Sequence, residues 1–336
     1  MSRLLRVLTS FPVRAAVTVA LLGALAAWVD WGQFVRRLEK GHWELFAVGV
    51  LVVAVALVIG GLRWHVFLRA GEVRTTVPQT LRAYSIGMFA NNFLPTGFGG
   101  DAARALVIAP AAPSTARAVA SVVVDRVTAL ACLVMLSWLT VAIAPDEVPG
   151  SLVGLLGITT AAGVAAASAL ALAAHRGRRT AGDTFLRRLN RPLAQVWAAI
   201  GGRAEARSVV ARTTLLGLLY QGTMLLASWI LARAIDLDLS FALLAVVTPL
   251  VIVATLFPIS IAGFGVREGG YVALLAEAGV SAPDATLLSL LNVAALAIAT
   301  LPGAFALLLP AVRRHDRPRP ETQPGEHAET VDAAPR

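Results

Sequence analysis

The feature that most constrains this chain is a series of long runs that contain no charged residue. Residues 45–62 form one such run of about 18 residues, which as a helix is just long enough to cross a hydrocarbon core of roughly 30 Å. Because lipid cannot satisfy exposed peptide groups, a run of this kind must fold as a helix. Further uncharged runs lie at residues 83–100, 153–174, 213–232, 239–266 and 285–312. The pattern predicts an all-α, polytopic membrane helix bundle.

Composition agrees with this prediction. The chain has 336 residues, of which 57% are hydrophobic and 15% are charged, whereas a soluble domain carries roughly 25% charged residues. The net charge is +9, but the arginines gather at the ends of apolar runs, where they anchor helices to anionic lipid. We therefore expect no nucleic-acid partner. The single Cys132 excludes an intramolecular disulfide, and the five scattered histidines suggest no metal site, so no cofactor is expected.

The basic segments predict the orientation of the chain in the membrane. Residues 175–212 contain nine arginines against Asp183 and Glu205, which predicts a cytoplasmic loop. Its length of about 38 residues allows a surface helix but no catalytic domain with its own core. Arg313 and Arg314 follow the last run and place the C-terminus in the cytoplasm. The expected location is the cell (plasma) membrane.

The N-terminal segment allows two interpretations. Arg3, Arg6 and Arg14 precede the uncharged residues 15–29, a pattern that resembles a signal peptide. Since the later runs are also spans, we favour an uncleaved first helix with its N-terminus in the cytoplasm. Basic residues at 36–40 would then lie outside, against the positive-inside rule, unless this segment is an interfacial helix.

Two glycine-rich, polar stretches interrupt the apolar pattern, at residues 91–104 and 257–270. Each contains, in the same order, a proline, a Gly-Phe-Gly sequence and an acid, and each follows an apolar run. The charge pattern gives the two stretches opposite flanking topology. This is the pattern of an inverted repeat whose broken helices meet near the bilayer midplane. We therefore predict about six full spans plus two re-entrant helical hairpins.

The predicted domain organisation follows from the repeat. Residues 1–312 are expected to form a single transmembrane domain, with a first repeat at about 15–145 and a second at about 151–312. The tail, residues 313–336, is rich in proline and charge and is expected to be disordered.

Six charged residues lie within or next to apolar segments, where each costs about 2.5–3.5 kcal/mol at a helix centre. They face one another or a polar pathway, and the half-helix N-termini beside them suit a phosphate. The alternative is that Asp101 with Arg104, Asp125 with Arg126, and Arg267 with Glu268 only anchor helices. The complete set of candidate substrate-binding residues is Asn91, Asn92, Pro95, Gly97, Gly99, Asp101, Arg104, Asp125, Arg126, Gly263, Gly265, Arg267 and Glu268.

Residues 91–104 and 258–270 together resemble the membrane region of the lysylphosphatidylglycerol synthetase family, a flippase-like family, and the similarity extends over about residues 15–312. The resemblance implies a bundle that moves a lipid with a polar head group between leaflets. One departure is the lack of a soluble aminoacyl-transferase domain after the last run, which argues against synthesis of an aminoacylated lipid. By motif the resemblance carries over Asn92, Pro95, Gly99, Asp101, Arg104, Gly263, Gly265, Arg267 and Glu268.

The resulting expectation is a transporter for a phospholipid or polyprenyl-type lipid, and not an enzyme. Arg104, Arg126 and Arg267 would bind the phosphate through bidentate contacts, and Asp101 and Glu268 would orient them or receive a cationic head group. An alternative is a membrane scaffold that recruits a separate lipid-modifying enzyme through the basic loop. The sequence has no recognisable set of serine, histidine and acid for intramembrane catalysis.

Overall fold

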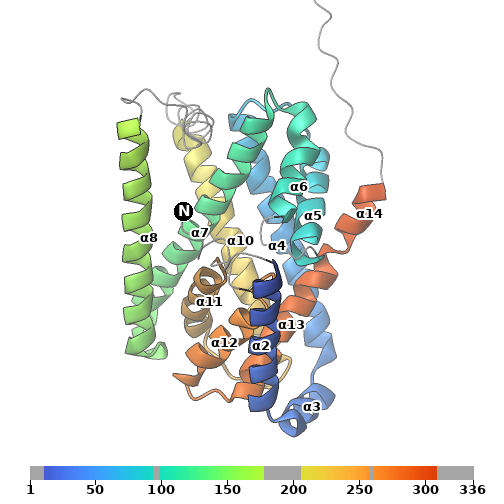
Figure 1. Ribbon diagram of the computed structural model, residues 1–336, viewed down its shortest axis with the longest axis vertical. Helices are drawn as coiled ribbons and strands as arrows, with labels where there is room; N and C mark the ends of the chain where they lie inside the picture. Colours follow the sequence, from blue (N-terminus) through green and yellow to red (C-terminus); the bar gives the residue numbers. More distant parts are fainter. Residues whose placement is uncertain (1–10, 94–98, 178–205, 257–259, 309–336) are drawn as a thin grey trace, which may run out of the picture.

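The computed structural model (Figure 1) describes residues 11–93, 99–177, 206–256 and 260–308, and its regular elements there are all helical. This confirms the predicted all-α class. Two short 3-10 turns, Ala109–Ala111 and Pro145–Glu147, connect longer helices. The helices in order are α2 (Phe11–Trp28), α3 (Trp31–Lys40), α4 (Trp43–Ala70), α5 (Val77–Phe93), α6 (Gly99–Ile108), α7 (Thr115–Ile143), α8 (Gly150–Gly177), α10 (Ala206–Arg233), α11 (Phe241–Leu256), α12 (Val266–Ala276), α13 (Ala282–Thr300) and α14 (Pro302–Leu308).

Within the described ranges, five helical segments are long and apolar enough to cross a membrane: α4, α7, α8, α10, and α13 together with α14. A sixth is obtained if α2 and α3 count as one span, although these two helices are bent by 82°. The prediction of about six spans therefore agrees with the structure.

Helix α4 is the centre of the bundle. It packs along α10 and also against α5, α7 and α13. Small residues permit this close approach: a Cβ added at Gly49 would lie 2.7 Å from Leu231 of α10, and one at Gly60 would collide with the ring of Tyr84 of α5. Trp64 of α4 is completely buried. The buried charged residues described below lie on α4 and on helices around it.

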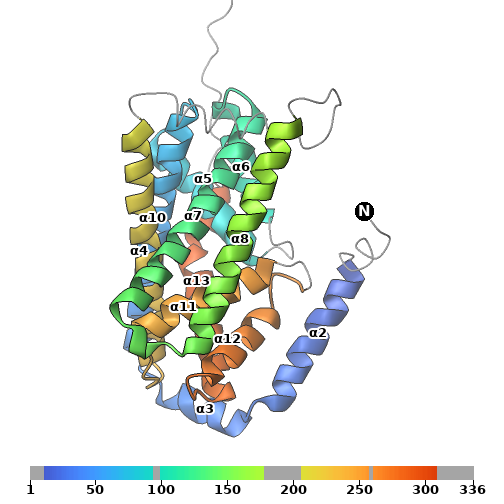
Figure 2. The same cartoon turned by 90° about the vertical axis from the view of Figure 1, so that its left-hand side faces the viewer.

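Helices α5 and α6 form a hairpin in the upper half of the molecule (Figures 1 and 2). The chain descends along α5 and returns to the same end along α6. The two helices cross so closely that a Cβ at Gly100 would collide with the carbonyl oxygen of Gly87, which is why glycine is needed at this crossing. Their connection, residues 94–98, lies outside the described ranges.

Helices α11 and α12 form a second hairpin, which enters from the lower end. The helical path is broken before α12 by three residues with positive φ, namely Ala262 (51°), Gly263 (79°) and Gly265 (81°). The two hairpins thus enter from opposite ends, in the arrangement that an inverted repeat predicts. Both pack against α13.

Helix α3 lies across the lower end of the bundle (Figure 2). Its exposed Trp31 and Val35, together with basic residues on the same short helix, fit the interpretation of an interfacial helix. Arg37 joins α3 to the bundle through Asp284 of α13, with Nε and Oδ1 3.2 Å apart. The greater part of the predicted basic loop (178–205) and the predicted disordered tail fall outside the described residues.

Candidate functional site

A buried network of ion pairs joins α4, α6 and α7. In α6, Asp101 and Arg104 are three residues apart and therefore lie on one face of the helix. Arg104 donates from Nε to Oδ1 of Asp101 (3.2 Å), and its Nη2 lies 3.1 Å from the same oxygen as an ion pair. The sequence suggested this pair as a helix anchor, and in the structure it is the first link of a buried network.

Asp125 of α7 is the second acid of the network, and it holds two arginines. Its Oδ1 accepts a hydrogen bond from Arg63 Nε (3.0 Å) and lies 2.8 Å from Arg63 Nη2, while its Oδ2 accepts a hydrogen bond from Arg104 Nη1 (2.9 Å). The three side chains are only 2–3% exposed. Buried charges require such pairing, because removing either sign leaves an uncompensated ion in a medium of low polarity.

Arg126 completes the network from a different side. It is the next residue after Asp125 and therefore points about 100° away around the helix. It bonds Asp101 through Nε (2.9 Å to Oδ2) and Nη2 (3.1 Å to Oδ1). Unlike its partners, the Arg126 side chain is 50% exposed. Asp101 therefore connects a buried arginine with an arginine at the surface of the bundle.

Aromatic rings fix the buried guanidinium groups. The guanidinium of Arg104 lies 4.9 Å from the ring centre of Trp64 and 5.3 Å from that of Tyr84, and the guanidinium of Arg63 lies 5.2 Å from Tyr220. Rings at these distances attract a cation. The arginines are therefore held in fixed positions before any ligand arrives.

The network contains one more positive charge than negative charge, since it has three arginines and two aspartates. Arg126 lies eleven positions after Thr115, the first residue of α7, which corresponds to about 17 Å along the helix. Arg126 therefore lies well inside this long apolar helix and not at its end. A half-exposed guanidinium at this depth is suited to an anionic group such as a phosphate.

The other residues of the first polar stretch position the hairpin. The side-chain oxygen of Asn91 accepts a hydrogen bond from the N–H of Gly100 (2.9 Å). Asn92 donates to Thr300 Oγ1 at 2.9 Å and so attaches the hairpin to α13. Gly99 is the first residue of α6. The candidates Pro95 and Gly97 lie outside the described residues.

The charged residues of the second polar stretch make contacts within their own hairpin. Glu268 Oε2 accepts a hydrogen bond from the N–H of Gly265 (2.6 Å), and Arg267 Nη2 donates to the carbonyl oxygen of Ala262 (3.4 Å). Gly263 and Gly265 provide the positive φ angles of the turn. Among the described residues, Arg267 and Glu268 are not ion-paired with each other and do not join the network. The structure therefore brings together Asp101, Arg104, Asp125 and Arg126, and places the second stretch in a separate set of contacts.

Arg63 was not among the residues that the sequence pointed to. The uncharged run ends at residue 62, so a span predicted from this run ends before Arg63. Helix α4 instead continues to Ala70, and this places Arg63 inside the bundle with 1% of its surface exposed. The apolar residues at 64, 66, 67 and 68 were the signal that the helix continues.

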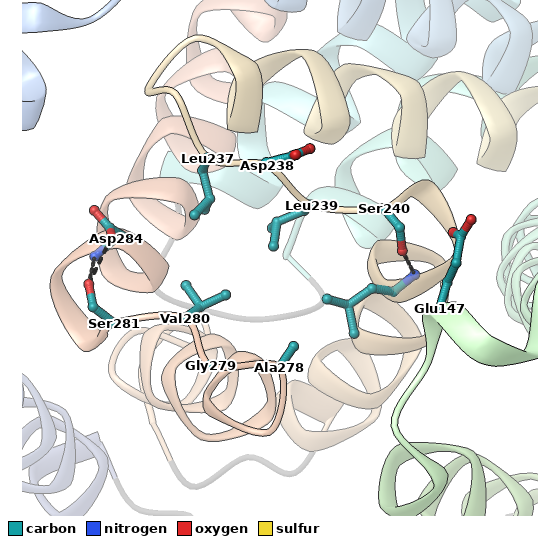
Figure 3. Close-up of a pocket in the computed structure, with 11 residues that line it drawn as sticks. Glu147, Leu237, Asp238, Leu239, Ser240, Ala278, Gly279, Val280, Ser281 and Asp284 are labelled. Carbon is teal, nitrogen blue, oxygen red and sulfur yellow. Dashed lines mark hydrogen bonds between the residues drawn. The ribbon is translucent and has the colours of Figure 1, made fainter.

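A separate pocket of about 480 Å³ opens at the lower end of the molecule, between the α10–α11 and α12–α13 connections (Figure 3). Leu239 and Val280 point into it. Two of its carboxylates are occupied by other contacts, because Asp284 pairs with Arg37 and Asp238 pairs with an arginine of α10. This pocket is therefore not part of the ion network.

The long apolar helices, the opposed hairpins and the buried ion network define a polytopic helical membrane protein. More specifically, the chain belongs to the lysylphosphatidylglycerol synthase transmembrane-region family, whose profile matches residues 13–312. This confirms the resemblance seen in the sequence.

Two curated relatives share limited identity with the chain. A UPF0104 membrane protein of Pyrococcus horikoshii is 23% identical over 114 residues, which is 33% of this chain and 34% of the relative. A UPF0104 membrane protein of Methanothermobacter thermautotrophicus is 27% identical over 93 residues, which is 28% of this chain and 26% of the relative. The matches thus span about a third or less of these relatives. No solved structure matches the chain significantly.

Proposed function

We propose that this protein is a flippase-like transporter that moves a phosphate-containing lipid between the two leaflets of the membrane. The observation that supports this most directly is Arg126, the half-exposed arginine of a network with one surplus positive charge. A charge at this depth is costly unless it meets a partner of opposite sign. Asp101 already pairs with Arg126, and a lipid phosphate that reaches Arg126 from within the membrane would neutralise the one surplus positive charge of the network.

In this proposal Arg126 is the residue that contacts the phosphate. Its fork of N–H groups allows two parallel hydrogen bonds to phosphate oxygens. Asp101 orients the fork, because it holds both Nε and Nη2 of Arg126. Exposed apolar residues of the same helix, such as Val127 and Leu139, provide a surface for acyl chains. The transport step needs no catalytic residue.

We further propose that the upper end of the bundle in Figure 1 is cytoplasmic and that both termini lie on that side of the plasma membrane. The support is the positive-inside rule, since Arg69, Arg74, Arg117 and Arg212 lie at or near the helix ends on that side. With this orientation the α5–α6 hairpin enters from the cytoplasm and the α11–α12 hairpin from outside. Rocking of one hairpin against the other would give the lipid access to each leaflet in turn.

The test is a leaflet assay with the purified full chain in vesicles, using fluorescent phosphatidylglycerol and a fluorescent polyprenyl phosphate as probes. Arg126→Ala is expected to abolish most of the transport. Arg117→Ala is the matched control, because Arg117 lies on the same helix and pairs with Glu72 near the upper end of the bundle. Equal rates for Arg126→Ala and wild type would refute the assignment. Probe binding without movement would instead favour an accessory subunit that presents lipid to a separate enzyme.

A further inference from the structure

The second hairpin contains a buried carboxyl group that the ion network does not use. Glu268 lies in the first turn of α12, and none of its surface is exposed. Its Oε2 accepts the N–H of Gly265, but its Oε1 has no hydrogen-bond partner. A buried carboxylate oxygen without a partner is uncommon, because burial removes the water that would otherwise solvate it.

No cation in the described part of the surroundings compensates Glu268. Helix α12 packs against α2, α11 and α13. Helix α11 contains no titratable residue, and the only one in α13 is Asp284, which is near the far end of that helix and is paired with Arg37. The only charged residue of α2 is Arg14, whose side chain lies outside the description.

Helix α12 itself offers two further polar groups. The guanidinium of Arg267 is directed to the carbonyl oxygen of Ala262 and lies 6.0 Å from the ring of Phe264. Tyr271 is buried one turn further along the helix. Glu268 thus has no ion-pair partner among the described residues, in contrast to both aspartates of the network.

The two oxygens of this carboxyl group lie in different surroundings. The N–H of Gly265 at the start of α12 bonds Oε2, whereas Oε1 is buried with neither a hydrogen-bond donor nor a cation among the described residues. Leu21 of α2 lies against Gly265, so α2 covers this part of the hairpin. Because none of the Glu268 surface is exposed, solvent can reach it only when the helices packed around this turn move.

We propose that Glu268 is a proton-binding site and that its proton couples lipid movement to a pH gradient. In one position of the hairpin, water on one side donates a proton, and an O–H bond forms at Oε1. In the other position this O–H bond breaks and the proton returns to water on the opposite side. The coupling rests on the proposed transport function, but the proton-binding site does not.

Infrared spectroscopy of the purified full chain tests the site without any transport. Spectra recorded over a range of pH are expected to show a carboxylic-acid C=O band that Glu268→Gln removes. Glutamine keeps an oxygen for the N–H of Gly265, so the turn is retained. Glu277→Gln is the control, because Glu277 is exposed and bonds Ser151, and it should keep the band. If no band depends on Glu268 at any pH at which the protein stays folded, the site is wrong.

A pH gradient across vesicles that contain fluorescent phosphatidylglycerol tests the coupling. With one proton coupled to one lipid, a gradient of one pH unit changes the steady-state leaflet ratio by up to about tenfold. The ratio for Glu268→Gln should not respond to the gradient. If wild type moves lipid but ignores the gradient, the coupling fails and the transport function stands. If wild type moves no lipid, the proposed function fails, and the infrared result still decides the proton site.

Discussion

Replacing Asp125 by asparagine tests whether the ion network is held together by charge. In the native protein this carboxylate accepts hydrogen bonds from Arg63 Nε (3.0 Å) and Arg104 Nη1 (2.9 Å), and Arg63 Nη2 forms an ion pair with it at 2.8 Å. The amide of asparagine keeps one acceptor oxygen but no charge, so Arg63 is left buried without an anion. Removing one partner of a buried pair costs about 3–5 kcal/mol, and we expect the free energy of unfolding to fall by that amount.

A second substitution should then recover a substantial part of the lost free energy of unfolding. Replacing Arg63 by methionine in the Asp125→Asn protein removes the uncompensated charge and leaves an apolar side chain of similar length. The double variant should therefore be more stable than the single variant by about 2 kcal/mol or more. If Arg63 stabilised the bundle only through packing, its replacement by methionine would lower the stability of the Asp125→Asn protein instead of raising it.

The measurement is equilibrium unfolding of the purified chain in mixed micelles, followed by circular dichroism while the fraction of denaturing detergent is raised. The control is the double variant Arg117→Met with Glu72→Gln, because this pair is 26% and 50% exposed and should contribute about 0–1 kcal/mol. A double network variant that is no more stable than Asp125→Asn would refute the reasoning.

Three further predictions concern single residues. Arg126→Ala should weaken binding of a phosphate lipid by about 1.5–3 kcal/mol, or roughly 10- to 150-fold, in a lipid-exchange titration in which Arg117→Ala leaves affinity unchanged. Gly100→Ala should destabilise the fold by about 1–3 kcal/mol, because its Cβ would collide with a carbonyl of α5. Gly163→Ala is the control, because Gly163 faces open space on α8. Equal unfolding midpoints of the two variants in denaturing detergent would contradict this prediction. Asn92→Ala should cost about 0.6–1.7 kcal/mol through the lost bond to α13, and an unchanged unfolding midpoint would show that this bond is dispensable.

The helical bundle and the two hairpins could be predicted because lipid imposes strict requirements on sequence. A span needs about 20 apolar residues, and a charge within such a run is rare enough to stand out. For this reason Asp101, Arg104, Asp125 and Arg126 stand out in the sequence itself. The spans could be predicted because they depend on the average composition of about 20 consecutive residues.

The pairing of these charges could not be read from the sequence. Asp125 and Arg126 were considered as a pair because they are adjacent, but neighbouring residues on a helix point about 100° apart. They therefore bind different partners, Asp125 with Arg63 and Arg104, and Arg126 with Asp101. Such pairings depend on which helices meet, and that information lies in the packing of α4, α6 and α7.

The sequence pattern did not indicate Arg63 as a member of the network, and the reason is a different one. A span predicted from uncharged residues must end at the first charge, so a helix that carries its own buried charge is predicted too short. Likewise, the sequence predicts one substrate-binding set that includes Arg267 and Glu268 together with the residues of the network, because the second motif repeats the first one. The repeat correctly indicated the second hairpin, but similar sequence order did not imply a shared set of contacts.

The position of Asp101 makes the two hairpins mechanically unequal. Asp101 belongs to α6, yet it holds Arg126 of the neighbouring α7 as well as Arg104 of its own helix. Sliding α6 by one turn past α7 would move these groups about 5 Å apart and separate charges in an apolar medium. The first hairpin is thus fastened to the central helices as part of a fixed frame. The α11–α12 hairpin has no ion pair among the described residues, so in the proposed transport cycle it is the element that would rock at the smaller energetic cost.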